Sequence, residues 1–201
     1  MDHRLWTIDH GPWSKSINES IVCAGFGGQG VMVLGKFFAI AGMEAGLYVT
    51  WLPAYGAEVR GGTAHSFIRL SSSPIGDPMV TEPKAAVIMN TPSLEKFEKK
   101  MIPGGLLILN TSIVERKSSR KDIDIVECQL TDEAMTVGNV KAANIIAAGI
   151  YLAKKNIFSK DLVLGVIKKM AGGRDELARL NSRAVERGYE IGAEVNVGRK
   201  T

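Results

Sequence analysis

The sequence is poor in the residues that most metal sites and nucleophilic sites require. Its 201 residues include two cysteines and three histidines. Cys23 and Cys128 each lie in an apolar, strand-like run, which favours buried free thiols over a disulfide, and no C-x-x-C pair is present for zinc or an iron–sulfur cluster. His65 is the only histidine after residue 10, and we expect it to be an ordinary strand residue. No Ser/His/Asp or Cys/His set can be assembled, so we expect no catalysis by this chain alone.

A strong charge of either sign is also lacking. The chain has 25 Lys and Arg residues against 21 Asp and Glu residues, and a net charge of +4. No basic stripe interleaved with aromatic residues is present, so nucleic-acid binding is not expected. The densest basic stretch, residues 116–121, is predicted to be a solvated loop.

No apolar run is long enough to predict a membrane span. Lys36, Glu44 and several glycines interrupt the longest runs, and residues 1–20 contain no apolar segment of the kind found in signal peptides. We therefore expect a cytoplasmic protein that binds neither membranes nor nucleic acid.

What is present is the pattern of an α/β domain. Hydrophobic residues make up 45% of the chain, which is enough for one substantial core. Strand-like runs alternate with helical periods, which predicts a three-layer α/β/α sandwich with a central mixed sheet. Residues 1–18 show no clear period and are predicted to be an N-terminal arm, either a docking segment or a remnant of cloning. Residues 19–195 are predicted to form a single domain.

The expected elements follow from the hydrophobic periods and from the positions of glycine and proline. Strands are predicted at residues 20–25, 48–52, 63–70, 85–89, 106–110 and 123–128. Helices are predicted at residues 29–46, 94–100, 140–155, 162–170 and 175–191. Pro53 should end the second strand, and Ser93 is the expected N-cap of the second helix. Residues 71–83 contain three prolines and should be irregular.

The chain is organised around a glycine-rich turn between the first strand and the first helix, residues 25–31 (GFGGQGV). Gly25, Gly27 and Gly30 have the G-x-G-x-x-G spacing, which predicts a Rossmann-like strand, turn and helix. The missing Cβ atoms permit a sharp turn and a close approach to a phosphate. The N-terminus of the following helix would direct its free N–H groups at an anion.

The acidic residue that would complete a dinucleotide site is missing. Such a site needs Asp or Glu about twenty residues further on, to bind the ribose hydroxyls. Residues 48–53 (YVTWLP) contain no acid, Trp51 is placed where one is wanted, and Glu44 lies too early, on the helix. An NAD(P) or FAD site is therefore disfavoured, whereas a purely structural turn stays open.

A second unusual loop, residues 53–64 (PAYGAEVRGGTA), follows the second strand. Glu58 and Arg60 could form a surface ion pair that contributes little. Alternatively, Arg60 and the two glycines after it could present a guanidinium and bare N–H groups to a phosphate or carboxylate. Both loops follow strand ends, so we expect them at the same edge of the sheet, in a shared site for a ligand or partner.

These two loops, in this order and at this spacing, resemble the gamma subunit of 2-oxoacid:ferredoxin oxidoreductases. The likeness rests on residues 25–31 and residues 55–64, and continues through residues 72–75 (SSPI), residues 180–184 (LNSRA) and Gly188-Tyr189. It covers about residues 19–194. Phe26 and the run EVRGGT are more similar to the 2-oxoglutarate and branched-chain types than to the pyruvate type. Ala54, Ala57 and Val59 depart from the commoner Pro-Ser-Tyr-Gly-Pro-Glu-Met-Arg form.

The resemblance implies a non-catalytic subunit of an enzyme that converts a 2-oxo acid and coenzyme A (CoA) to an acyl-CoA and CO2, with electrons passed to ferredoxin. Thiamine diphosphate and 4Fe-4S clusters are implied in sister subunits, one thiamine-binding and one ferredoxin-like, within a hetero-oligomer. CoA is implied as a co-substrate, with no cofactor bound tightly by this chain and no metal ligand or catalytic residue in it. The residues expected to contact CoA or a sister subunit are Gly25, Gly27, Gly28, Gln29, Gly30, Tyr55, Glu58, Arg60, Gly61, Gly62 and Thr63.

Two other interpretations stay open. One is a stand-alone nucleotide-binding module that binds NAD or FAD through the same glycine turn. The other is a structural adaptor whose loops contact only protein. Co-purification with sister subunits, and binding of NAD, FAD or CoA to the isolated chain, would separate these interpretations.

Overall fold

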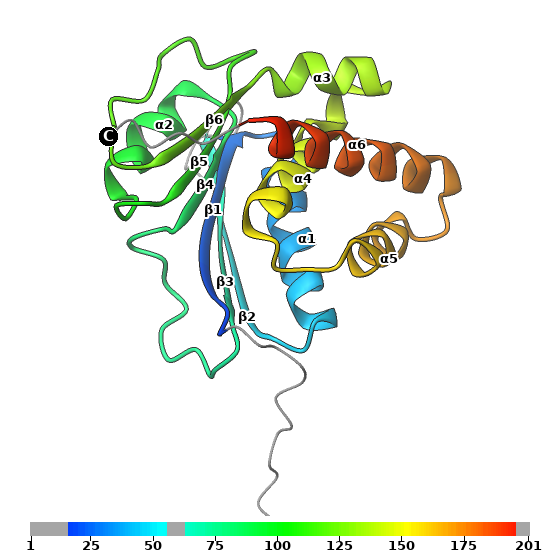
Figure 1. Cartoon of the computed structure of the whole chain (residues 1–201), viewed down its shortest axis with the longest axis horizontal. Coiled ribbons are helices and arrows are strands. Elements are labelled where there is room, and N and C mark those ends of the chain that lie inside the picture. Colours follow the sequence, from blue (N-terminus) through cyan, green and yellow to red (C-terminus); the bar gives the residue numbers. More distant parts are fainter. Residues whose placement is uncertain (1–15, 56–62, 196–201) are drawn as a thin grey trace, which may run out of the picture.

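The computed structural model describes residues 16–55 and 63–195, which form a six-stranded sheet with helices on both faces (Figure 1). The elements in chain order are β1 (Asn18–Phe26), α1 (Val31–Glu44), β2 (Tyr48–Tyr55), β3 (Thr63–Ser71), β4 (Ala85–Ile88), α2 (Thr91–Phe97), the 3₁₀ turn η1 (Glu98–Lys100), β5 (Leu106–Asn110), β6 (Asp124–Cys128), α3 (Leu130–Val137), the 3₁₀ turn η2 (Val140–Ala142), α4 (Ala143–Lys155), α5 (Lys160–Ala171) and α6 (Asp175–Glu194). The predicted α/β class is confirmed.

The sheet is mixed, as predicted, and has the strand order β2-β3-β1-β4-β5-β6. β3 pairs antiparallel with β1 and β2, whereas β1, β4, β5 and β6 run parallel. β1 is therefore a central strand, and its residues 20–25 are all buried. An unbroken apolar run, rather than alternation, is what a strand covered on both faces requires.

Two unequal helical layers cover the sheet. α1, α4, α5 and α6 lie on the side of one face, and α2 lies on the other (Figure 1). Successive side chains of β1 enter different cores, so that Ile21 and Cys23 join the larger cluster, whereas Val22 and Ala24 join the smaller one. This division follows from the period of two in a strand. The predicted three-layer α/β/α sandwich is confirmed.

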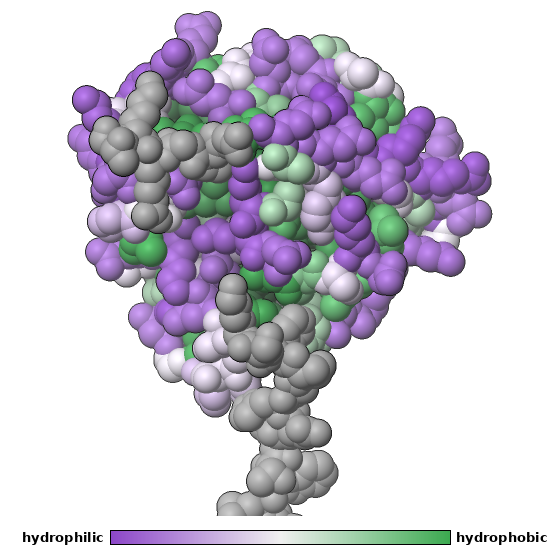
Figure 2. Space-filling view, in the orientation of Figure 1, coloured by the Kyte–Doolittle hydropathy of each residue, from purple (hydrophilic) through white to green (hydrophobic). Residues whose placement is uncertain are grey.

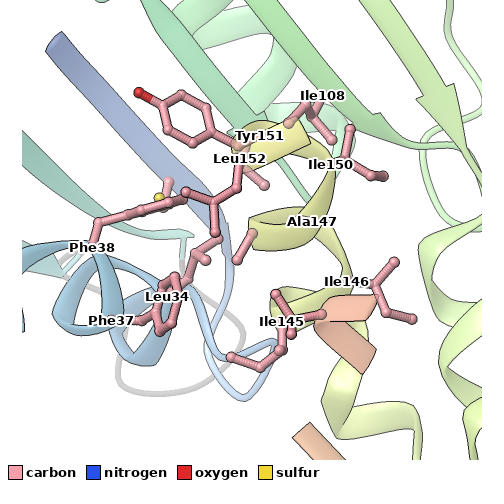
Figure 3. Close-up of a cluster of buried hydrophobic side chains, with 14 of the residues drawn as sticks. Leu34, Phe37, Phe38, Ile108, Ile145, Ile146, Ala147, Ile150, Tyr151 and Leu152 are labelled. Atoms are coloured by element: carbon pink, nitrogen blue, oxygen red, sulfur yellow. The ribbon is translucent and has the colours of Figure 1, made fainter. Parts of the chain in front are cut away.

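The larger core forms where α4 packs against α1 and the sheet (Figure 3). Ten consecutive residues of α4, Ala143–Leu152, are buried. Phe38 of α1 and Tyr151 of α4 meet edge to face, with ring centroids 4.9 Å apart. The Tyr151 hydroxyl donates a hydrogen bond to the Glu19 carboxylate at 3.1 Å, which satisfies a polar group that would otherwise be buried unpaired. Burial and the neighbouring Glu19 raise the pKa of Tyr151 well above its usual value.

The outer surface is largely polar on the face that Figure 2 shows, where apolar side chains form separate patches among hydrophilic ones. Within residues 16–55 and 63–195, no helix combines the length and the apolarity needed to cross a bilayer.

The second helix begins earlier than predicted. α2 starts at Thr91, and its N-cap is Asn90, whose Oδ1 accepts a hydrogen bond from the Ser93 N–H at 3.0 Å. The prediction of Ser93 as the N-cap is therefore wrong. Pro92 lies in the first helical turn, where the missing N–H has no intrahelical partner to lose. The segment predicted as the end of this helix is the 3₁₀ turn η1.

Pro53 does not end the second strand. β2 continues to Tyr55 and pairs with β3 alone, because β2 is the edge strand of the sheet. Proline is tolerated on an edge strand, where its missing N–H removes no ladder hydrogen bond.

α3 was not predicted. Only Leu130 and Ala134 of this helix are buried, so its apolar stripe is too short to give a helical period. Its position is instead supported by a tertiary ion pair, because Arg187 of α6 donates two hydrogen bonds to Glu133, at 2.8 and 3.2 Å. These bonds lower the pKa of Glu133.

The basic stretch 116–121 is irregular, as predicted, but two of its arginines are bound to the domain. Arg116 forms an ion pair with Glu98, whose side chain is fully buried. Arg120 donates hydrogen bonds to the carbonyl oxygens of Glu98 and Met101, at 2.8 and 3.1 Å. The loop is therefore anchored by its arginines rather than simply solvated.

Candidate functional site

Two neighbouring parallel strands at the centre of the sheet are followed by helices on opposite faces of the sheet. β1 leads into α1 on one face, and β4 leads into α2 on the other (Figure 1). Such a divergence at the carboxyl ends of adjacent strands leaves a crevice between the two loops, which is the usual ligand position in open α/β sheets. The glycine turn lies at this position, directly after β1.

The second glycine-rich loop begins and ends at the same edge. Phe26, the last residue of β1, pairs with Thr63, and Tyr55, the last residue of β2, pairs with Ala64. Tyr55 is 73% exposed. The expectation that the two loops share one edge of the sheet is confirmed. Four of the predicted site residues, Glu58, Arg60, Gly61 and Gly62, lie outside the described residues, so their contacts stay predictions.

The glycine turn closes through its own backbone and leaves the start of α1 open. The Gln29 N–H donates a hydrogen bond to the Phe26 carbonyl at 3.2 Å. Gly28 and Gly30 have φ values of +96° and +74°, which favour glycine. Gly30 is the N-cap of α1, and no described side chain caps this helix. The N–H groups of its first turn and its dipole therefore favour an anion at this position.

Three of the four glycines of the turn are required for different physical reasons. A Cβ on Gly25 would lie 2.8 Å from the side chain that follows β4, and one on Gly30 would lie 2.4 Å from a side-chain nitrogen on α4. Gly28 has open space around it but needs its positive φ. Gly27 has neither a positive φ nor a described atom within 4 Å of a built Cβ. A purely structural turn therefore explains Gly25, Gly28 and Gly30, but not Gly27.

Gln29 fastens the turn to the end of β4. Its Oε1 accepts a hydrogen bond from the Phe26 N–H at 2.6 Å, and its Nε2 donates one to the Met89 carbonyl at 3.0 Å. Both ends of the amide are thus engaged with the backbone. Gln29 shapes the turn in this structure, and its direct contact with a ligand stays a prediction.

Alanine substitutions along the turn should separate these roles. We expect Gly27→Ala to change the free energy of unfolding by less than about 0.5 kcal/mol, as is usual for unconstrained surface positions. Gly28→Ala should lower it by about 1 kcal/mol, because an L-residue is strained at positive φ. Gly30→Ala should lower it further, since its Cβ also meets Asn144. Urea unfolding measures this order, and a loss in Gly27→Ala as large as that in Gly30→Ala would contradict it.

Asn144 is a residue of the site that the sequence analysis missed. It is 3% exposed, and its Nδ2 donates a hydrogen bond to the Gly30 carbonyl at 3.0 Å, across 114 positions of sequence. Its Oδ1 has no hydrogen-bond partner among the described residues. An asparagine inside the apolar face of α4 was the available signal, because a buried amide is costly unless it is paired.

Asn90 is a second missed residue, and it lies at the α2 side of the crevice. It is fully buried after the carboxyl end of β4, where its Oδ1 caps α2. Its Nδ2 has no hydrogen-bond partner within the part of the chain that the structure describes. Asn144 therefore contacts the glycine turn directly, whereas Asn90 directly follows Met89, whose carbonyl accepts the hydrogen bond from Gln29.

His65 packs as a strand residue, in agreement with the expectation from sequence. Its ring centroid lies 5.2 Å from those of Phe67 and Phe97. Burial, and then the positive charges of Lys96 and Lys100, lower its pKa. Across residues 16–55 and 63–195, no group of three or more His, Cys, Asp and Glu side chains could hold a metal ion.

Proteins of known name are similar to this chain along most of the described domain. Ketoisovalerate oxidoreductase subunit VorA of Methanothermobacter thermautotrophicus is 30% identical over 168 residues, which are 83% of this chain and 35% of VorA, so the chain spans about a third of that relative. 2-Oxoglutarate synthase subunit KorC of Methanocaldococcus jannaschii is 26% identical over 187 residues, 89% of this chain and 96% of KorC. The structure of 2-oxoglutarate:ferredoxin oxidoreductase from Magnetococcus marinus has the same fold, with a TM-score of 0.81 and 22% identity over 92% of this chain and 32% of that one.

The segments that carry the resemblance inferred from the sequence all fall inside the region that one family model matches. That model, described as pyruvate ferredoxin/flavodoxin oxidoreductase, matches residues 20–191. It includes the glycine turn, the second loop and the C-terminal segment with Gly188. The resemblance is thereby confirmed, and the chain belongs to the pyruvate ferredoxin/flavodoxin oxidoreductase family.

Proposed function

We propose that this chain is the gamma subunit of a multi-subunit 2-oxoacid:ferredoxin oxidoreductase of the 2-oxoglutarate or branched-chain type. The complex would convert a 2-oxo acid and CoA to an acyl-CoA and CO2, and ferredoxin would accept the two electrons released. The names of two relatives support this substrate class, since one refers to ketoisovalerate and the other to 2-oxoglutarate. A separate subunit of this size is supported by KorC, 96% of which is aligned.

In this proposal the chain supplies no catalytic residue, and thiamine diphosphate and the 4Fe-4S clusters belong to sister subunits. Burial raises the pKa of the Cys128 thiol to about 11, and burial also raises the pKa of Cys23. Cluster ligation requires thiolates, so both cysteines are suited to packing rather than to electron transfer. We propose the cytoplasm as the location of the complex, as expected from the sequence.

Gly27 is the observation that carries the proposed role in CoA binding. Neither packing nor backbone conformation requires a glycine there, whereas a ligand that approaches the backbone closely would. The diphosphate and the 3′-phosphate of CoA suit the open N-terminus of α1 and the guanidinium of Arg60. Arg60 belongs to the loop whose ends, Tyr55 and Thr63, flank this edge. The related enzyme from Magnetococcus marinus is described with CoA bound.

Exposed apolar side chains support a sister subunit at the same edge. Among the exposed large hydrophobic residues, Tyr55 ends β2, Ile113 follows β5, and Val33 and Met135 lie in the helices that follow β1 and β6. A contiguous patch of such side chains would be typical of a protein interface. The edge is therefore suited both to assembly and to CoA.

The test uses the assembled complex. The tagged chain, co-expressed with the thiamine-binding and ferredoxin-like subunits, should retain both through purification. In that complex we expect Arg60→Ala to raise the KM for CoA about tenfold or more, which corresponds to about 1.4 kcal/mol. The kcat should change less than about twofold, because Arg60 would bind the nucleotide end of CoA, away from the reacting thiol.

Arg179→Ala is the matched control for Arg60→Ala. Arg179 is exposed on α6 and makes no hydrogen bond or ion pair with the described residues. A KM that stays unchanged in Arg60→Ala removes Arg60 from the CoA site. Loss of the sister subunits during purification contradicts the assignment as a gamma subunit, and tight binding of NAD or FAD favours the stand-alone module.

A further inference from the structure

A cavity of about 570 Å³ lies on the helical side of the glycine turn, in the size range of small-ligand sites. Gly28 and Gly30 form one wall, and residues of α1, α4, α5 and α6 form the others. None of its described lining residues comes from β2 or β3, the strands that carry the loop with Arg60. Among the described residues, the cavity shares the glycine turn and the start of α1 with the proposed CoA site and includes none of the strand residues beside the second loop.

The cavity is electropositive. Lys36, Lys141 and Arg174 line it, and its described lining includes no carboxylate. None of these three cations forms an ion pair with a described residue. The Arg174 guanidinium is held in place, because its Nε donates a hydrogen bond to the Ala171 carbonyl at 2.9 Å. Like charges that converge in a cleft raise the local concentration of anions.

Two long helices begin at the cavity, and one of them, α1, adds to this field. Gly30 is the N-cap of the 14-residue α1, and Arg174 is the N-cap of the 20-residue α6. Both residues line the cavity, and no described side chain caps either helix. The uncapped N–H groups and the positive dipole end of α1, whose first turn contains no acid, favour an anion at this position. Asp175 and Glu176 in the first turn of α6 already offset the dipole of that helix.

The remaining lining of the cavity is apolar or carries amide groups, and an inorganic ion alone would leave it without a partner. Phe37, Ile167 and Leu177 present apolar surface to the cavity. Asn144 also lines it and is almost fully buried, with a carbonyl oxygen that has no partner among the described residues. Asn181, from the C-terminal segment of the family resemblance, lines it as well. An apolar wall beside the unpaired amide oxygen of Asn144 suits a body that is flat or apolar and carries a hydrogen-bond donor.

We propose that this cavity binds an organic phosphate. The phosphate faces Lys36, Lys141 and Arg174, and an aromatic or apolar body lies against Phe37 and Leu177. A bare anion would leave the apolar wall in water, and a neutral apolar ligand would leave the cations unpaired. The proposal holds whether or not Arg60 binds CoA, since a free nucleotide and the nucleotide end of CoA share this chemistry.

Calorimetric titration of the full chain tests the proposal with three probes. Adenosine 3′,5′-bisphosphate carries both charge and an aromatic body, adenosine carries the body alone, and pyrophosphate carries the charge alone. We expect the bisphosphate to bind at least about tenfold more tightly than either of the others. The triple variant Lys36→Ala/Lys141→Ala/Arg174→Ala should weaken its binding at least about thirtyfold, because each charge-assisted contact contributes severalfold.

The matched control is Lys99→Ala/Lys117→Ala/Lys121→Ala, which removes the same charge from exposed positions outside the cavity lining. Equal weakening by the two triple variants would mean non-specific attraction and would overturn the proposal. Absence of bisphosphate binding, or equal affinity for pyrophosphate, would also overturn it.

Thermal melting of both variants checks that they fold. The KM for CoA in the assembled complex then identifies the source: a cavity variant that leaves it unchanged assigns the cavity to a free nucleotide, whatever the result for Arg60→Ala.

Discussion

Gly188→Ala should lower the free energy of unfolding by about 3 kcal/mol, at the upper end of the cost of overpacking a core. A Cβ on Gly188 would lie 2.1 Å from the Ile146 carbonyl oxygen and 2.8 Å from the Gly149 Cα. Both are backbone atoms, so no rotation of a side chain relieves the contact. α4 and α6 would have to move apart, and α4 carries much of the larger core (Figure 3).

The cause of this expected loss is a close crossing of two helices. Gly149 and Ala153 of α4 face Gly188 and Gly192 of α6, and a Cβ on Gly192 would lie 2.6 Å from the Ala153 Cβ. Small residues four apart lie on one face of a helix, so both helices present a smooth strip at which their backbones can approach. Gly149→Ala should be similarly destabilising, because its Cβ would lie 2.2 Å from the Val185 carbonyl oxygen.

Gly165→Ala is the matched control, since it makes the same change inside α5. No described atom lies within 4 Å of a Cβ built on Gly165. Alanine is the better helix former by about 0.5–1 kcal/mol, so this variant should be more stable than the parent chain. Urea unfolding of the three variants gives the midpoints and slopes. Stabilisation in both Gly165→Ala and Gly188→Ala would show that helix propensity, rather than the crossing, decides the outcome.

The sequence predicted those elements whose own residues determine them. The buried parts of β1, β4 and β5 are mainly apolar because both of their faces are covered, and a run of that kind is visible without tertiary information. The turn after β1 was equally visible from its glycine spacing, and the positive φ of Gly28 and Gly30 is a local requirement for glycine. The contacts of Gly25 with Met89 and of Gly30 with Asn144 depend on distant parts of the sequence. The order and spacing of the two loops then gave the family resemblance.

Elements that depend on distant partners were predicted poorly. α3 is supported by Arg187, which lies 54 positions from Glu133. Pro53 is compatible with β2 only because β2 is an edge strand, and the order of strands in a sheet is not a local property. Asn90 and Ser93 are both good N-caps, so composition alone could not choose between them.

In the candidate site too, the features determined by local sequence were predicted and those that depend on distant residues were not. Its glycine turn and its place at the edge of the sheet were predicted, because both follow directly from the strand before them. Asn144 and the cations of the cavity were not, since α1, η2, α4 and the start of α6 bring them together from positions 36 to 174. A cluster assembled from separate helices has no spacing in the sequence that would reveal it.

Removal of Arg116 should cost more stability than removal of its buried partner. The Glu98 side chain is fully buried, whereas that of Arg116 is 39% exposed. In Arg116→Ala the buried carboxylate loses its compensating cation and keeps the weaker partner Ser119, whose N–H lies 3.3 Å from Oε2. We therefore expect a loss of about 3 kcal/mol. In Glu98→Leu an apolar side chain fills the site and Arg116 can turn toward water, so the loss should be about 1 kcal/mol or less.

The double variant Arg116→Ala/Glu98→Leu decides whether the buried carboxylate is the source of this asymmetry. It should be close to Glu98→Leu in stability, because no unpaired charge is left inside the protein. Glu95→Ala is the control for the same arginine: the Glu95 carboxylate is 61% exposed and lies 3.9 Å from Arg116 Nη1, so its loss should change stability by less than about 0.5 kcal/mol. Urea unfolding at neutral pH compares the four proteins. Equal losses in the two single variants, with an additive double variant, would mean that Arg116 stabilises the loop by packing alone, and that the burial of Glu98 costs nothing that Arg116 has to offset.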